Sequence, residues 1–151
     1  MLDNLQIIFW SIAYTFIIVA GWKNRSEKMI SMPYGAGILN FGWELCALQQ
    51  SQGFWGHILW IGLDAVIFSI GFFFLQSRKQ KGLYIILTYL VTAGLWFLFA
   101  RYNGMLITVF IIDLIMAVFY LVDWKQISPV LKVPIAVCKL LGDLFAGILY
   151  S

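Results

Sequence analysis

Residues 54–76 read FWGHILWIGLDAVIFSIGFFFLQ, an apolar run in which Asp64 is the only residue with a formal charge. A helix needs about 20 predominantly apolar residues to cross the hydrocarbon core of a bilayer, so this run predicts a membrane-spanning helix. Similar runs occur along the rest of the chain, at residues 6–22, 29–50, 82–100, 104–122 and 130–150. All are expected to be helical, because a bilayer offers no partner for unpaired backbone groups.

The overall composition agrees with a membrane location. The chain is 62% hydrophobic and only 11% charged, and its mean hydropathy is +0.89. A soluble domain carries about 25% charged residues. Lipid is therefore expected to cover part of the surface. We predict an all-α fold: one transmembrane domain over residues 1–151, built as a polytopic bundle of about six membrane-spanning helices.

Basic residues give this bundle an orientation. Of the 10 lysines and arginines, eight flank or lie in the first, third and fifth connections: Lys23, Arg25, Lys28, Arg78, Lys79, Lys81, Lys125 and Lys132. The positive-inside rule places those connections in the cytoplasm and both termini outside. We expect an integral membrane protein, of the inner membrane if the source is bacterial and of the endoplasmic reticulum if it is fungal.

Charged residues inside the apolar runs are the main functional signal. They are Glu44, Asp64, Asp113, Lys139 and Asp143. Each costs about 2.5–3.5 kcal/mol at the centre of a membrane helix, so such residues usually mark a functional site. Their depth and helical phase gather them into one cavity in the outer half of the bundle. One lysine cannot neutralise four acids, so we expect some carboxyl groups to be protonated and able to donate a proton.

Polar and aromatic residues on the same helix faces are expected to line this cavity and bind the substrate: Asn40, Trp43, Trp60, Tyr89, Trp96, Phe110, Lys139 and Asp143. Three structural alternatives remain open. Lys139 and Asp143, four residues apart on one helix, can simply neutralise each other. Asp64 or Asp113 can pair with Lys139. Asn40 can join two helices or orient Glu44.

Metal and nucleic-acid functions are disfavoured. Cys46 and Cys138 are isolated and are expected to be core residues. His57, the only histidine, has no partner at ligand spacing, so neither a metal site nor a cofactor is predicted. The net charge of +3 arises in the loops and does not indicate a nucleic-acid partner.

One segment resembles a known family. Residues 29–44 read MISMPYGAGILNFGWE, and this stretch is similar to the integral-membrane terpene cyclases of fungal meroterpenoid and indole-diterpene pathways and their bacterial relatives. In that family a Met-Pro run leads into Asn-x-x-Trp-Glu on the second helix, which Asn40, Trp43 and Glu44 match. The aromatic opening of the next run fits too, and the resemblance covers about residues 8 to 70.

The resemblance implies cyclisation of a prenyl chain, often a terminal epoxide, begun by protonation with Glu44 as the acid. The implied partners are a lipophilic prenyl or terpenoid substrate and the surrounding membrane lipids. The family's second acid is an aspartate on a seventh helix, and the six runs contain no counterpart to it. Asp64, Asp113 or Asp143 is the expected substitute, and Trp60, Trp96 and Phe110 would face the cationic intermediates.

Two other functions fit the same acids. A small proton-coupled transporter or channel also needs carboxyl groups within the membrane. A non-catalytic membrane subunit could use them only for assembly. The sequence leaves open whether the protein forms an oligomer.

Overall fold

The computed structural model describes residues 2–24, 36–48, 54–102, 105–125 and 127–150. Within these ranges the chain is helical and contains no strand, as predicted. The elements are α1 (Leu2–Asn24), η1 (Ala36–Asn40), α3 (Phe41–Ala47), α4 (Phe54–Phe74), α5 (Arg78–Tyr102), α6 (Met105–Asp123) and α7 (Pro129–Tyr150). Because η1 continues directly into α3, the described residues form six helices, one on each predicted run.

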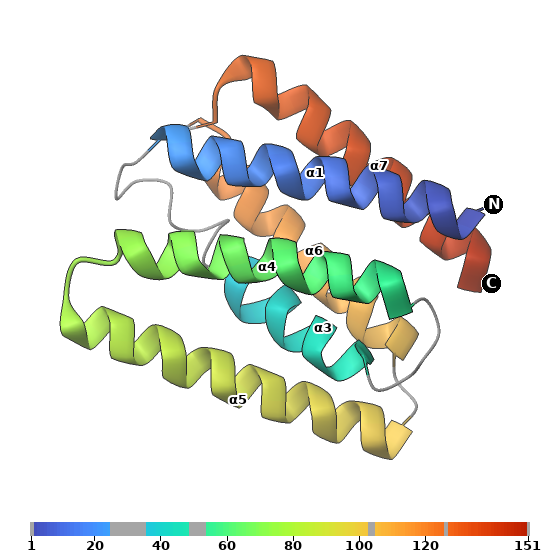
Figure 1. The fold of residues 1–151 in the computed structure, drawn as a ribbon, viewed down its shortest axis with the longest axis horizontal. Helices are drawn as coiled ribbons and strands as arrows, with labels where there is room; N and C mark the ends of the chain where they lie inside the picture. Colours follow the sequence, from blue (N-terminus) through green and yellow to red (C-terminus); the bar gives the residue numbers. More distant parts are fainter. Residues whose placement is uncertain (1, 25–35, 49–53, 103–104, 126, 151) are drawn as a thin grey trace.

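Successive helices run in alternating directions through the bundle (Figure 1). As a result, α1 begins and α7 ends at the same end of the molecule, although they are the first and last helices. Helix α1 packs most extensively against α7 and also contacts α4, while α3 lies between α4 and α5. The bundle therefore brings the first and last helices together, with α4 between α1 and the short second helix.

Three of the described helices are long and apolar enough to cross a membrane: Asn4–Lys23 in α1, Trp55–Phe74 in α4 and Arg78–Leu98 in α5. Ile111–Val122 in α6 is a shorter apolar helix. Large apolar side chains are also exposed on the outer helices, among them Leu90, Phe97 and Leu114. A wide exposed apolar surface is typical of contact with lipid or a partner. These findings support a membrane protein, while six full spans stay a prediction.

The contact between α1 and α7 depends on Gly142. A Cβ atom at this position would overlap the indole ring of Trp10, and Trp10 is almost fully buried. The indole Nε1 also donates a hydrogen bond of 2.9 Å to Asp143, the next residue of α7. The missing side chain of Gly142 therefore lets Trp10 reach its polar partner.

Replacing Gly142 with alanine should lower the thermal stability of the protein, because the added methyl group must displace Trp10 from its buried site. Overpacking of this kind costs about 1–3 kcal/mol. Gly147→Ala on the same helix is the matched control, since its added Cβ meets no atom within 4 Å. Thermal melts followed by tryptophan fluorescence would check this, and equal melting temperatures for the two variants would contradict it.

The second helix begins its described part with a π-helical segment, η1, and not with a regular α-helix. Such segments are uncommon and often lie at functional sites. Gly37 permits the close approach, because a Cβ atom there would lie 2.9 Å from the Cα atom of Phe68 and would overlap the Tyr84 hydroxyl group. Asn40, the last residue of η1, and Glu44, one turn further along in α3, are both buried.

Candidate functional site

Glu44 and His57 form a buried pair between α3 and α4. Oε2 of Glu44 lies 2.7 Å from Nδ1 of His57, and each side chain is only 3% exposed. The His57 ring lies between two tryptophans, with centroid distances of 5.8 Å to Trp43 and 5.4 Å to Trp60. A carboxyl group and an imidazole at this distance can share one proton without creating net charge in the core.

The sequence placed His57 on one helix face with Trp60 and Asp64 and disfavoured it as a metal ligand, but it did not predict the pair with Glu44. The signal was present in the phase of the third apolar run, which places His57, Trp60 and Asp64 on one face. All three are buried in the structure. Glu44 was expected to lie in the site, and it does lie in the buried centre of the bundle.

A second polar cluster surrounds Lys139 on α7. Its Nζ atom contacts Oδ1 of Asp113 on α6 and lies 2.9 Å from Oδ1 of Asp143. The ammonium group also lies 4.7 Å from the centroid of the Trp10 ring, within the range of a cation–π interaction. Both of the pairings left open by the sequence therefore occur, and Lys139 joins α6 to α7.

Asp64 on α4 is enclosed by the bundle, with none of its surface exposed. Neither of its carboxyl oxygens has a hydrogen-bond partner among the residues that the structure describes, and the same is true of Trp60 Nε1. Buried polar atoms are nearly always hydrogen-bonded in native proteins. Asp64 therefore has capacity for a proton, a water molecule or a substrate atom.

Asn40 and Tyr14 form a further buried polar contact. The Asn40 amide nitrogen donates a hydrogen bond of 3.1 Å to the Tyr14 hydroxyl oxygen, which joins η1 to α1. Of the five charged residues that the sequence was expected to gather, Lys139 contacts Asp113 and Asp143, whereas Glu44 pairs with His57. The depth of these residues in a bilayer stays a prediction.

A cavity of about 250 Å³ lies beside these clusters. Its polar wall consists of Tyr14, Asn40, Asp113, Lys139 and Asp143. The remaining wall is mostly apolar and comes from α1, α6 and α7: Ile17, Met116, Ala117, Tyr120, Ile135, Ala136 and Leu140. Glu44, Asp64, Trp43 and Trp60 are not among the lining residues, so of the five charged residues expected in one cavity only Asp113, Lys139 and Asp143 line this one.

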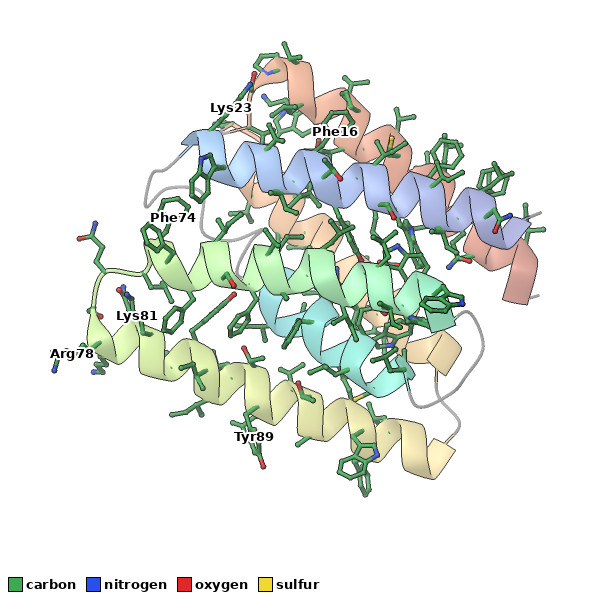
Figure 2. All side chains as sticks on the ribbon, viewed as in Figure 1. Phe16, Lys23, Phe74, Arg78, Lys81 and Tyr89 are labelled. Atoms are coloured by element: carbon green, nitrogen blue, oxygen red, sulfur yellow. The ribbon has the colours of Figure 1, made fainter. Side chains whose placement is uncertain are left out.

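Two residues expected to bind substrate lie elsewhere. Tyr89 is 75% exposed and Trp96 is 58% exposed, and Figure 2 shows Tyr89 pointing away from the bundle. Helix α5 instead turns Tyr84, Thr88 and Leu95 inward. The prediction that Tyr89 and Trp96 line the cavity does not fit this structure, and the Phe110 side chain lies outside the described part of the chain.

Chemically, the arrangement can hold and move protons. It combines a buried carboxyl–imidazole pair, a buried carboxyl group with no hydrogen-bond partner in the described part of the chain, and a partly exposed lysine between two carboxylates. Cys46 and Cys138 are free thiols, and no cluster of metal-ligating side chains occurs among the described residues. Comparison of the chain with protein-family models, with curated proteins and with solved structures gives no match.

Proposed function

We propose that this chain is a membrane-embedded enzyme that cyclises a prenyl or epoxy-prenyl substrate by protonating it, as its resemblance to the membrane terpene cyclases implies. The observation that carries the proposal is the Glu44–His57 pair, a carboxyl group enclosed in the bundle and held 2.7 Å from an imidazole. General acids are commonly buried carboxyl groups whose environment favours the protonated form.

The chemistry needs one proton donor and one proton acceptor. Protonation of a terminal epoxide breaks a C–O bond, the neighbouring double bonds close the rings, and the final cation loses a proton to give a product isomeric with the substrate. The enzyme therefore gives up one proton and regains one. Glu44 and His57 together can do both, because either group can carry the proton that they share.

Asp64 is the better placed of the other two predicted catalytic acids. Its carboxyl oxygens have no hydrogen-bond partner within the described ranges, whereas Asp113 is held by Lys139. Asp64 is therefore the proposed second acid. The indole rings of Trp43 and Trp60 supply electron-rich faces beside His57, the partner of the acid, and Trp60 is one of the residues expected in this role.

The proposal is tested by supplying an epoxidised C15 prenyl chain to the purified protein in lipid nanodiscs. We expect a new product with the mass of the substrate and a different chromatographic retention time, absent from empty nanodiscs. Unchanged substrate across a series of epoxidised and plain prenyl chains would refute the proposal.

Proton-coupled transport is the second candidate. It is favoured by the spread of ionisable side chains over four helices, with Glu44 on α3, His57 and Asp64 on α4, Asp113 on α6 and Lys139 on α7. In liposomes loaded with a pH-sensitive dye, a transporter would carry protons when its solute is added. A cyclase would form product with no proton flux.

We also propose that the end of the bundle bearing Lys23, Arg78 and Lys81 faces the cytoplasm. These three side chains lie at one end in Figure 2, and the helices that carry the termini begin and end at the other (Figure 1). Cysteines introduced at the exposed residues Asn4 and Ser77, in a variant with Cys46 and Cys138 replaced, would test this. A membrane-impermeant thiol reagent should label residue 4 in intact cells and residue 77 only after permeabilisation. The reverse pattern would invert the orientation.

A further inference from the structure

The cavity lined by Tyr14, Asn40 and the Lys139 cluster has polar walls on one part and apolar walls on the other. Its rim includes Ala117 on α6 and Leu140 on α7, which are both exposed, Leu140 to 68%. The cavity therefore reaches the surface between these two helices. At about 250 Å³ it is smaller than the 300–1,000 Å³ typical of sites that enclose a whole drug-sized ligand. A head group and the first part of a chain would fit inside, with the remaining chain lying in lipid.

Tyr14 supplies a hydrogen-bond donor to this space. Its hydroxyl oxygen accepts a bond from Asn40, so its own proton is not used in that bond. No acceptor for this proton is found among the described residues, and Tyr14 lines the cavity. A buried hydroxyl group normally has a partner for its proton. An oxygen atom of a bound ligand would provide the acceptor for this proton.

The charges on the same wall restrict the ligand. Among the residues that the structure describes, Lys139 is the only cationic side chain that lines the cavity, and it is already paired with Asp113 and Asp143. An anionic head group would have to compete with two carboxylates for one ammonium group and would lose its hydration on entry. An ammonium head group would have to compete with Lys139 itself. An uncharged oxygen can accept from Tyr14 without disturbing these pairs.

We propose that this cavity binds a membrane amphiphile with an uncharged oxygen head group, and that the Tyr14 hydroxyl group is the hydrogen-bond donor that holds the head. The chain of the amphiphile leaves the cavity between α6 and α7. The inference goes beyond the proposed function, because Glu44 and Asp64 are not among the residues that line this cavity, and binding of this kind does not require turnover.

The test measures binding of C15 prenyl compounds that share one chain and differ only in the head group. The alcohol should bind at least 10-fold more tightly than the diphosphate or the amine to the wild-type protein in nanodiscs. Tyr14→Phe keeps the ring and removes only the hydroxyl group, and one neutral hydrogen bond is worth roughly 3- to 10-fold in affinity. Tyr89→Phe on the exposed face of α5 is the matched control and should bind the alcohol as wild type does.

Equal affinity of Tyr14→Phe and wild type for the alcohol would overturn the proposal. Binding of the diphosphate or the amine as tight as that of the alcohol would also overturn it. This second comparison uses only the wild-type protein, so it holds even if the Tyr14→Phe variant does not fold. Selective alcohol binding without any isomer formed from the epoxide would count against the proposed cyclase function alone.

Discussion

Lys139→Met should sharply destabilise the protein or prevent its accumulation in the membrane. Lys139 is 22% exposed and is the shared partner of Asp113 and Asp143. Methionine preserves length but removes the charge, so two carboxylates, 15% and 29% exposed, would face each other in a partly buried site. Removing one partner of a fully buried ion pair costs about 3–5 kcal/mol, which is the upper bound for the loss here. Thermal melts of the protein in detergent would measure the loss.

Two variants show whether charge is the cause. Lys132→Met, on the same helix, removes only a cation–π contact of 4.9 Å with the half-exposed Trp124 ring, worth about 0.5–1 kcal/mol. The triple variant Lys139→Met, Asp113→Asn, Asp143→Asn should recover much of the stability lost by Lys139→Met alone. Equal melting temperatures for the two lysine variants would show that the cluster does not hold α6 against α7.

Glu44→Gln should lower the rate of isomer formation at least 100-fold with little loss of stability. Glutamine has the shape of glutamate and can still hydrogen-bond to His57, but it cannot donate a carboxyl proton. General acid catalysis is typically worth 10²–10⁴-fold. His57→Gln should cause a smaller loss of rate, because the acid itself would remain. A larger loss for His57→Gln than for Glu44→Gln would make histidine the primary donor.

The helices were predictable because each depends on local composition. The apolar run 54–76 becomes α4, Phe54–Phe74, and the run 82–100 becomes α5, Arg78–Tyr102. A long apolar stretch has few alternatives to a helix. Its limits were less predictable, because α5 begins at Arg78 and includes Lys79 and Lys81, before the predicted run starts at residue 82. Composition also gave no sign of the π-helical segment η1, where Gly37 closely approaches α4.

The site was predictable only where polar residues marked one face of a helix. On α4 the polar residues His57 and Asp64 stand out against apolar neighbours, and their phase correctly predicted the buried face. On α5 nearly every position is apolar or aromatic, so the phase of Tyr89 and Trp96 carried no information about which face turns inward. Contacts between helices, such as Glu44 with His57, depend on how each helix is rotated against its neighbour, and one helix alone does not specify this.

The most direct test of the central claim, that Glu44 is the proton donor, is the first-turnover rate of isomer formation by Glu44→Gln and Glu27→Gln, compared at equal amounts of folded protein. Glu27 is the only other glutamate of the chain and lies in a predicted loop. The proposal predicts a rate at least 100-fold below wild type for Glu44→Gln and an unchanged rate for Glu27→Gln. A Glu44→Gln protein that cyclises its substrate at the wild-type rate would contradict it.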